Sequence, residues 1–224
     1  HSSGSRSASL QRRDRRMKRI DCLNILAPQI QDELVVVTLG VTKAEWDLIN
    51  PRDGNCYLSG MGTAASFGLG LALALPHRKV VVLESDGSML FGLNGLATIA
   101  VQKPKNLSII VFDNECYESI GGAPSQTAFG VDLEAIARGA GIANATTARD
   151  LDQFQKGTEK VLKGVGLSLV VAKIEPWIID VPAKYYHLLE ERNRFVRYIE
   201  QTEKISVLRP SKIHRRDPSK WKAS

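Results

Sequence analysis

Short runs of β-branched and other apolar residues alternate along this chain with longer segments of helical periodicity. The runs Val80–Leu83 and Leu107–Phe112 have the length and composition of strands that are buried on both faces of a parallel sheet. Leu34–Leu39 and Leu167–Ile174 have the same character. The alternation of such strands with helices predicts an α/β fold, a doubly wound parallel sheet with helices on both faces.

Helical segments are indicated by apolar residues that recur at steps of three and four positions. Between the first two strands these are Met89, Leu90, Leu93, Leu96, Ala97 and Ala100. Further helices are expected over 17–30, in a short segment containing Trp46 that Thr42 can cap, and from about residue 63 to 75. Asp132 and Asp150 can cap two more helices, over 133–140 and up to Lys163. An amphipathic helix over 185–199 is expected to lie outside the domain core.

These elements divide the 224 residues into three segments. Residues 1–16 are rich in Ser and Arg and are expected to be a disordered tail or a tag. Residues 17–175 carry the strand and helix pattern of one domain. Residues 176–224 are expected to form a linker, one helix and a basic tail.

Oxygen-bearing side chains follow two of the predicted strands directly. Ser85-Asp86-Gly87-Ser88 comes after the first and Asp113-Asn114 after the second. The carboxyl ends of neighbouring parallel strands share one edge of the sheet, so Asp86 and Asn114 should lie close together. Their oxygens, with the backbone carbonyl of Cys116, suit Mg²⁺. Ser88 and the amides after Gly87 begin a helix, where an anion is favoured. The pattern indicates a magnesium–diphosphate site; the alternative is an ordinary turn in which Asp86 or Ser88 caps the helix.

A glycine-rich turn, Gly60-Met61-Gly62-Thr63, leads into the helix that ends near residue 75. Gly62, Ser66 and Gly70 lie four apart and present a stripe of small side chains that another backbone can approach. The same turn matches the dinucleotide fingerprint G-x-G-x-x-A, and Glu84 follows about 20 residues later. NAD binding is therefore an alternative, although the strand preceding the turn is short and the alternative gives Asp86 and Asn114 no role.

With these two features the chain resembles the thiamine diphosphate enzymes, whose motif is usually Gly-Asp-Gly, a spacer and Asn-Asn. Ser85 stands for the first Gly and Asp113 for the first Asn, while Asp86 and Asn114 match. From about residue 34 to 142 the chain most resembles the diphosphate-binding (PP) halves of sulfopyruvate and phosphonopyruvate decarboxylases. Much of the likeness lies in L-S-G-M-G-T-A-A-S-F-G-L-G-L-A-L-A and D-L-E-A-I-A-R-G-A-G-I.

The resemblance implies that thiamine diphosphate and Mg²⁺ are cofactors. The implied metal ligands are Asp86, Asn114 and Cys116. Met61 would hold the cofactor bent, and the backbone of Ser59 and Met61 would bind its pyrimidine edge. The residues implied to bind the cofactor are Ser59, Gly60, Met61, Gly62, Asp86, Gly87, Ser88, Asn114, Cys116 and Tyr117.

The implied reaction is decarboxylation of a small 2-oxo acid, with carboligation of the acetolactate synthase type and a non-catalytic regulatory subunit as alternatives. In the resembled family the activating glutamate lies on a separate pyrimidine-binding (Pyr) domain. We therefore expect the catalytic residue on a partner subunit and the chain to act in an oligomer. The related decarboxylases usually carry Ser-Thr-Gly-Gly-Gln in the loop where this chain has Ser119-Ile120-Gly121-Gly122-Ala123, which leaves the substrate open.

The net charge of +6 is concentrated in the two ends of the chain, as in solvated tails, so no nucleic acid is expected as a partner. The longest apolar run, Gly60–Leu75, is shorter than the roughly 20 residues that span a bilayer, so no membrane segment is expected. Cys22, Cys56 and Cys116 show no disulfide or zinc spacing, which favours a cytoplasmic location.

Overall fold

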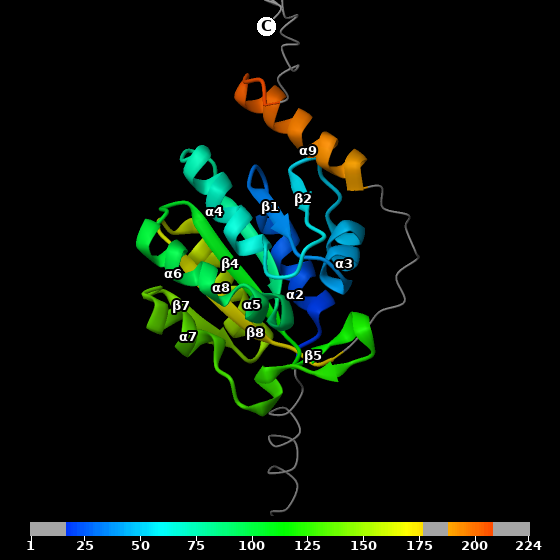
Figure 1. Ribbon diagram of the computed structural model, residues 1–224, viewed down its shortest axis with the longest axis vertical. Helices are drawn as coiled ribbons and strands as arrows, with labels where there is room; N and C mark the ends of the chain where they lie inside the picture. Colours follow the sequence, from blue (N-terminus) through cyan, green and yellow to red (C-terminus); the bar gives the residue numbers. More distant parts are fainter. Residues whose placement is uncertain (1–16, 177–187, 208–224) are drawn as a thin grey trace, which may run out of the picture.

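The computed structural model describes residues 17–176 and 188–207, and its central element is a six-stranded parallel sheet (Figure 1). Its strands occur in the spatial order β2-β1-β3-β4-β8-β7. Their bounds are Leu34–Val37 (β1), Asn55–Tyr57 (β2), Val80–Ser85 (β3), Leu107–Asp113 (β4), Ala145–Ala148 (β7) and Ser168–Lys173 (β8). The chain order reverses between β1 and β3, which is where ligands bind in open α/β sheets.

Each inner strand buries both of its faces, because alternate side chains point to opposite sides of the sheet. Val80 and Val82 of β3 contribute to the core on one side, and Val81 and Leu83 to the core on the other. This explains why the strands are continuous apolar runs rather than alternating ones.

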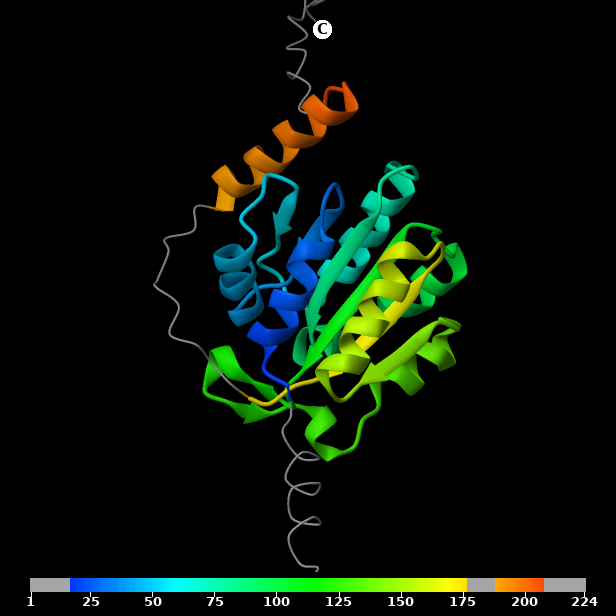
Figure 2. The ribbon, with the colours of Figure 1, turned by 180° about the vertical axis from the view of Figure 1, so that it is seen from behind.

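Helices cover both faces of the sheet, as the two opposite views in Figures 1 and 2 show. One face packs against Ala64–Ala74 (α4), Leu93–Gln102 (α6) and Leu133–Ala140 (α7). The other packs against Arg19–Leu26 (α2), Val41–Ile49 (α3) and Leu151–Lys163 (α8). The doubly wound α/β fold predicted from the sequence is therefore confirmed.

The predicted helix over Met89–Ala100 is wrong in one respect, because it is two helices, Asp86–Phe91 (α5) and Leu93–Gln102 (α6). They meet at Gly92, where an added Cβ would lie 2.3 Å from the carbonyl oxygen of Gly62. The glycine turn before α4 is thus packed directly against the junction of α5 and α6. Of the predicted small-residue stripe, Gly62 and Ser66 make close approaches to Gly92 and Gly95, whereas Gly70 faces open space.

One further prediction needs correction, one strand was not predicted, and two capping predictions are confirmed. Gly40, with φ of 84°, is the N-cap of α3, and Thr42 lies buried inside that helix rather than capping it. Strand β7 was not predicted, since Ala-Thr-Thr-Ala is neither strongly apolar nor long. Asp132 and Asp150 do cap α7 and α8, each accepting a hydrogen bond from the backbone three residues on.

The segment expected as a mobile loop after Tyr117 contains regular structure. Cys116–Tyr117 (β5) pairs antiparallel with Ala123–Pro124 (β6), with a 3-10 turn, Glu118–Ile120 (η2), between them. A second 3-10 turn, Gln126–Phe129 (η3), follows. This β5–β6 hairpin projects from the end of the molecule where β4 ends (Figure 1).

Helix α9, Leu188–Glu203, packs against β2 at the end of the sheet opposite the β5–β6 hairpin (Figure 1). Phe195 and Ile199 bury their side chains in the core, so the expectation that this helix lies outside the domain core is wrong, and its apolar face covers this domain. Arg78 attaches the end of the helix to the domain: it donates hydrogen bonds to Glu203 and, at 3.2 Å, to the Tyr198 hydroxyl. The first residues of the predicted helix, 185–187, lie outside the described residues, as do 1–16, 177–184 and 208–224. The division into three segments stays a prediction.

The docking of α9 can be tested with Phe195→Ala. Removing a ring that is 4% exposed should cost about 3–5 kcal/mol of unfolding free energy if α9 melts with the sheet. If α9 detaches first, the change should instead appear as faster proteolysis within α9. Leu189→Ala is the matched control, because Leu189 lies on the same helix and is 56% exposed. It should change neither the unfolding free energy nor the rate of proteolysis within α9. Equal behaviour of the two variants in thermal unfolding and limited proteolysis would contradict the packing.

No helix in residues 17–176 and 188–207 has the length and apolar character needed to cross a membrane.

Candidate functional site

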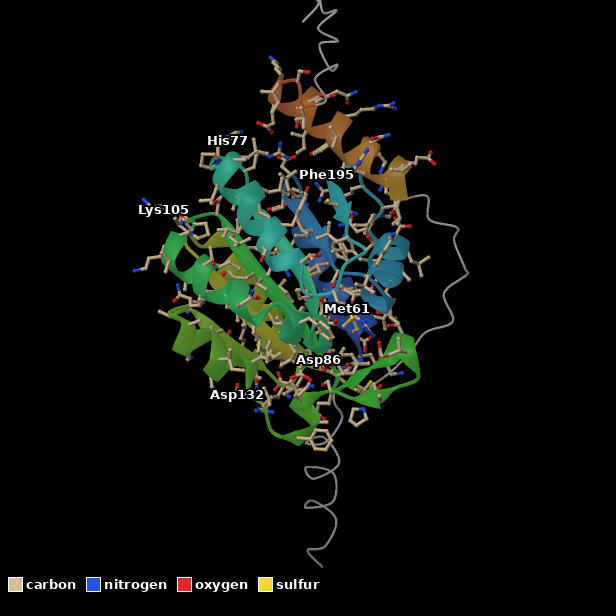
Figure 3. All side chains as sticks on the ribbon, in the orientation of Figure 1. Met61, His77, Asp86, Lys105, Asp132 and Phe195 are labelled. Carbon is tan, nitrogen blue, oxygen red and sulfur yellow. The ribbon has the colours of Figure 1, made fainter. Side chains whose placement is uncertain are left out.

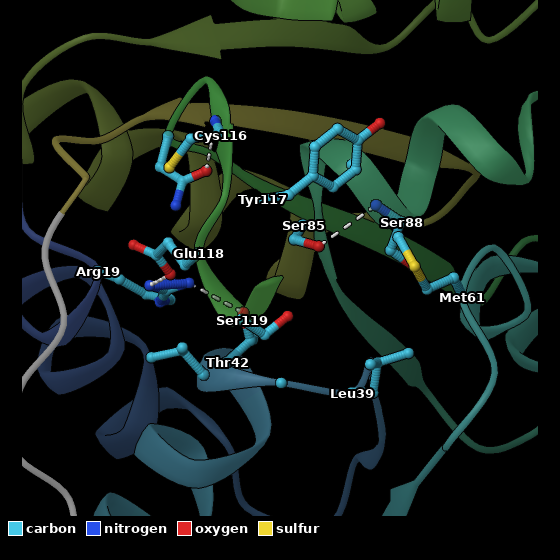
Figure 4. A pocket seen from close by; sticks show the side chains of 14 residues that line it. Arg19, Leu39, Thr42, Met61, Ser85, Ser88, Cys116, Tyr117, Glu118 and Ser119 are labelled. Carbon is cyan, nitrogen blue, oxygen red and sulfur yellow. Dashed lines mark hydrogen bonds and ion pairs between the residues drawn. The ribbon is translucent and has the colours of Figure 1, made fainter. Parts of the chain in front are cut away.

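A pocket lies at the carboxyl ends of β1, β3 and β4, at the point where the strand order reverses. Segments following four strands line it: Leu39–Thr42 after β1, Met61 after β2, Ser85, Gly87 and Ser88 around the end of β3, and Asn114 with Cys116–Ser119 after β4. Figure 4 shows Met61 and Ser88 on one side of this pocket and Arg19 and Glu118 on the other. The pocket therefore occupies the crevice in which α/β folds bind ligands.

Helix α5 begins at this pocket and presents its first turn to it. Ser85 is the N-cap, and its hydroxyl accepts a hydrogen bond of 3.4 Å from the backbone N–H of Ser88. The alternative in which Asp86 or Ser88 caps the helix is therefore wrong, and both side chains are left for other contacts. Gly87 is required by close packing, since a Cβ there would lie 2.4 Å from the ring of Tyr117. Gly87 and Ser88 of this first turn are buried, and both line the pocket.

Asp86 is fully buried at the end of β3, and its two carboxylate oxygens have different surroundings (Figure 3). Oδ2 accepts a hydrogen bond of 2.5 Å from Ser125 Oγ and lies 3.2 Å from Thr127 Oγ1. Oδ1 makes no hydrogen bond of ordinary geometry with any described residue. Burial, opposed by the hydrogen bond from Ser125 and reinforced by the nearby Asp113 carboxylate, raises the pKa of Asp86 to about 6. A buried carboxylate oxygen without a partner is costly unless a cation contacts it.

Asp113 lies at the end of the neighbouring strand β4 and is also buried. Its Oδ2 pairs with Lys173 Nζ at 2.6 Å, and its Oδ1 accepts a hydrogen bond of 2.7 Å from the Thr127 hydroxyl. Lys173 is the register partner of Asp113 in the adjacent strand β8. The same ammonium lies 3.3 Å from Glu115 Oε1. Lys173 therefore compensates a buried negative charge that an asparagine would not carry.

Asn114 forms a tight turn at the pocket edge. Its Oδ1 accepts a hydrogen bond of 3.2 Å from the backbone N–H of Cys116, and the intervening Glu115 has φ of 63°. A left-handed backbone is uncommon for a non-glycine residue and often marks a functional turn. Asn114 lines the pocket, and Asp86 follows the neighbouring strand end, buried between the lining residues Ser85 and Gly87.

The glycine turn is anchored to α5 by hydroxyl groups. The backbone N–H of Gly62 donates to Ser88 Oγ at 3.0 Å, and Thr38 Oγ1 donates to the same oxygen at 2.9 Å. Gly62 has φ of 74°, and a Cβ on it would lie 2.8 Å from the backbone of Phe91 and Gly92. These contacts fix the turn so that Met61, with its side chain 38% exposed, borders the pocket.

Glu84 lies beneath this turn and is fully buried. Burial raises the pKa of its carboxyl to about 7, an effect that the hydroxyls of Ser88 and Thr38 and the backbone N–H groups of Ser85 and Ala65 oppose. Its position in the core beside Ser88 leaves it outside the residues that line the pocket.

A buried ionic cluster that the sequence did not reveal borders the pocket on the side of α2. Arg19 Nε donates to Glu45 Oε2 at 3.0 Å, and its Nη2 donates to Glu118 Oε2 at 2.5 Å. All three side chains are at most 6% exposed. Arg19 thereby attaches the beginning of the β5–β6 hairpin to the domain. It comes from a region of many arginines, and the pattern gives no signal to distinguish it from the others.

Most of the cofactor-binding residues predicted from the sequence gather at this pocket. Met61, Gly87, Ser88, Asn114, Cys116 and Tyr117 line it. The backbone N–H of Gly62 donates to the lining residue Ser88, and Asp86 is the chain neighbour of the lining residues Ser85 and Gly87. Ser59 and Gly60 precede Met61 and are not among the described lining residues. Their part in binding stays a prediction.

The donor set can be compared with what a cation requires. Within the described residues, no group of three or more His, Cys, Asp and Glu side chains is placed to hold a metal, which excludes a zinc-type cluster there. The predicted site needs only one carboxylate, a side-chain amide and a backbone carbonyl, the oxygen set that Mg²⁺ takes alongside phosphate and water. The unpartnered Oδ1 of Asp86 fits this requirement.

Comparison with known families gives a match over residues 47–172 to the thiamine pyrophosphate enzyme C-terminal TPP binding domain. Sulfopyruvate decarboxylase subunit beta of Methanocaldococcus jannaschii is 35% identical over 71% of this chain and 85% of its own length. The protein of that name from Methanothermobacter thermautotrophicus is 36% identical over 82% of this chain and 96% of its length. Phosphonopyruvate decarboxylase of Streptomyces viridochromogenes is 37% identical over 70% of this chain but 39% of its length.

Solved structures share the fold at lower identity. Benzoylformate decarboxylase from Polynucleobacter necessarius superimposes with a TM-score of 0.61 at 22% identity over 72% of this chain. A thiamine diphosphate-dependent 4-hydroxybenzoylformate decarboxylase from Rhodococcus jostii gives the same TM-score at 19% identity over 71% of this chain. The match spans about a third of each of those chains, 34% and 33%.

Proposed function

This chain belongs to the thiamine pyrophosphate enzymes through their C-terminal cofactor-binding domain, and on that premise we propose that it is the diphosphate-binding subunit of a 2-oxo acid decarboxylase. One observation carries the proposal: Oδ1 of Asp86 is buried without a hydrogen-bond partner beside the first turn of α5, and Ser88 of that turn and Asn114 line one pocket. Such a site has one position for a divalent cation and another for an anionic phosphate.

The cofactor would be thiamine diphosphate with Mg²⁺. Asp86, Asn114 and the backbone carbonyl of Cys116 would hold the metal, and the backbone after Gly87 with Ser88 would bind the diphosphate. When bound, the thiazolium ring supplies the electron sink for loss of CO₂. The residues of this chain bind and orient the group, and Met61 borders the space that its rings would occupy.

Ser85 and Asp113, the two departures from the family motif, are compatible with binding of the cofactor. They therefore give no support to the alternative of a non-catalytic subunit. Ser85, in place of glycine, caps α5 with its own hydroxyl. Asp113, in place of asparagine, is neutralised by Lys173. Both changes are thus accommodated, while Asn114 still lines the pocket and Oδ1 of Asp86 still has no hydrogen-bond partner among the described residues. The NAD alternative loses its support, because the glycine turn follows the edge strand β2 rather than a strand beside the reversal point.

A second subunit should complete the site. Phe67 and Leu73 of α4 and Phe91 of α5 expose 40%, 50% and 66% of their surface, and such exposed apolar side chains are candidates for contact with another subunit. We propose that a Pyr-domain subunit covers this surface and the tip of the β5–β6 hairpin at Gly121-Gly122. The relatives named as beta subunits support a heteromeric enzyme.

The proposed substrate is a short 2-oxo acid with a second anionic group, such as sulfopyruvate or phosphonopyruvate, after the names of the relatives. Carboligation of the acetolactate synthase type is the alternative reaction, and product analysis distinguishes the two. The three cysteines carry no disulfide, and we propose a cytoplasmic location on that ground.

Calorimetry with the assembled protein tests the proposal directly. Thiamine diphosphate should bind when Mg²⁺ is present and bind much more weakly when the metal is removed with a chelator. NAD should give no heat under either condition. Tight NAD binding, or cofactor binding that does not depend on a divalent cation, would contradict the proposed site.

Met61→Ala should lower turnover by about tenfold or more while changing cofactor affinity less. The reason is that a side chain bordering the ring positions sets geometry, whereas metal and diphosphate supply most of the binding. Steady-state kinetics and cofactor titration of the same preparation separate the two effects. Met61→Leu, which keeps the apolar volume, is the control and should retain most of the turnover. An unchanged rate for Met61→Ala would make Met61 a general packing residue.

A further inference from the structure

Two buried hydroxyls outside the predicted site connect the ends of β3 and β4. Ser125 is fully buried and Thr127 is 4% exposed, and both lie immediately after the β5–β6 hairpin. Ser125 Oγ donates to Asp86 Oδ2 at 2.5 Å, and Thr127 Oγ1 donates to Asp113 Oδ1 at 2.7 Å. The two hydroxyl oxygens are 2.9 Å apart, and Thr127 Oγ1 also lies 3.2 Å from Asp86 Oδ2. The two carboxylates are thus bridged by two hydroxyls.

The backbone holds both hydroxyls in place independently of the carboxylates. The N–H of Ser125 donates to the carbonyl of Glu115 at 3.0 Å, and its carbonyl accepts from the N–H of Ala128 at 3.1 Å, which begins the η3 turn. On the far side, Lys173 holds Asp113 at 2.6 Å. The bridge is therefore anchored at both ends, in the η3 turn and in strand β8. A carboxylate fixed through one oxygen has its second oxygen fixed in direction as well.

From this geometry we infer that Ser125 and Thr127 are positioning residues for the divalent cation: Ser125 holds Oδ2 of Asp86 directly, Thr127 braces Ser125 and joins it to Asp113, and Oδ1 of Asp86 is left without a partner for the metal. The inference deepens the proposed function and rests on it. The ligand class is a hard divalent cation bound together with a diphosphate. Hydrogen-bonded partners of metal ligands commonly change metal affinity by about 10–100-fold when they are removed.

The bridge gives a second role to the β5–β6 hairpin. Its first part is attached through Glu118 to Arg19, and its end is attached through Ser125 and Thr127 to the two aspartates. Ile120 and the two following glycines form an exposed tip between these attachments. The same contacts that orient Asp86 thus fix the base of the loop that borders the pocket.

Thr127→Val removes the hydroxyl at constant shape and is the main test. In the full chain with its partner, the Mg²⁺ concentration that half-saturates binding of thiamine diphosphate should rise about 10–100-fold, measured by calorimetry at fixed cofactor concentration. At saturating Mg²⁺ the cofactor affinity should return to within a few fold of the original chain. Thr127→Ser, which keeps the hydroxyl, is the matched control and should restore the original Mg²⁺ dependence. Ser125→Ala should behave like Thr127→Val.

The possible outcomes separate a positioning role from a structural one. A purely structural role would lower the thermal unfolding temperature without changing the Mg²⁺ dependence, or would weaken cofactor binding equally at every Mg²⁺ concentration. Either result overturns the inference, as does failure of Thr127→Ser to restore what Thr127→Val loses. If the original chain binds cofactor and all variants show the same Mg²⁺ dependence, the two hydroxyls do not position Asp86 for the metal, and the inference is wrong while the proposed function stands. If the original chain binds no cofactor at any Mg²⁺ concentration, the proposed function is wrong and the inference falls with it.

Discussion

Asp86→Ala is expected to abolish Mg²⁺-dependent binding of thiamine diphosphate while the chain stays folded. Asp86 supplies the carboxylate at the metal position, and without its charge the cation loses its strongest protein ligand. Stability should change little, because burial already disfavours this carboxylate: its pKa is raised to about 6. Replacing it removes a desolvation cost together with the hydrogen bonds from Ser125 and Thr127. Asn114→Ala should weaken binding in the same direction but less, since it removes a neutral ligand.

Cofactor titration and circular dichroism of the assembled protein measure the two parts of this expectation. Asp150→Ala is a suitable control, because Asp150 is also a carboxylate at the start of a helix but serves only as the N-cap of α8. It should cost about 1 kcal/mol of stability and leave cofactor binding intact. Binding by both Asp86→Ala and Asn114→Ala at the original affinity would show that the site is assigned wrongly.

The second large effect concerns assembly: the 224-residue chain by itself should decarboxylate nothing at a measurable rate. Thiamine catalysis in the resembled family needs a glutamate against the pyrimidine ring. Of the described residues that line the pocket, Glu118 is the one carboxylic acid, and Arg19 already holds it. Phe67 and Leu73 of α4 and Phe91 of α5 remain exposed. We therefore expect the activating acid to come from a partner that covers this surface.

Purified alone, the chain should bind cofactor weakly, and co-expression with a Pyr-domain partner should restore activity. Phe91→Glu, at a side chain 66% exposed, should reduce complex formation at least tenfold in size-exclusion or calorimetric assays, because it places a charge in an apolar contact. Val165→Glu, at a side chain 83% exposed between α8 and β8, is the matched control and should assemble normally. Substantial turnover by a verified single-chain preparation would refute the expectation.

The fold and the main site could be predicted because they depend on local patterns. Continuous apolar runs such as Val80–Leu83 identify strands buried on both faces, and helical spacing identifies the segments between them. Parallel strands end at the same edge of a sheet, so Gly87 and Ser88 after β3 and Asn114 after β4 line one pocket although they are far apart in the chain. The sequence by itself thus determined the α/β architecture and the position of the candidate site.

The tertiary structure alone decided which side chains support that site. The contacts of Ser125 and Thr127 with Asp86 and Asp113, of Lys173 with Asp113, and of Arg19 with Glu118 join segments distant in the chain. Such contacts follow from strand order and register, and they leave no periodic signal in the sequence. Strand β7 was missed for a related reason, because an edge strand of small residues takes its structure from pairing with β8. The pattern of apolar residues along the chain shows which segments are buried. Which polar side chains pair is decided only when the folded sheet brings them together.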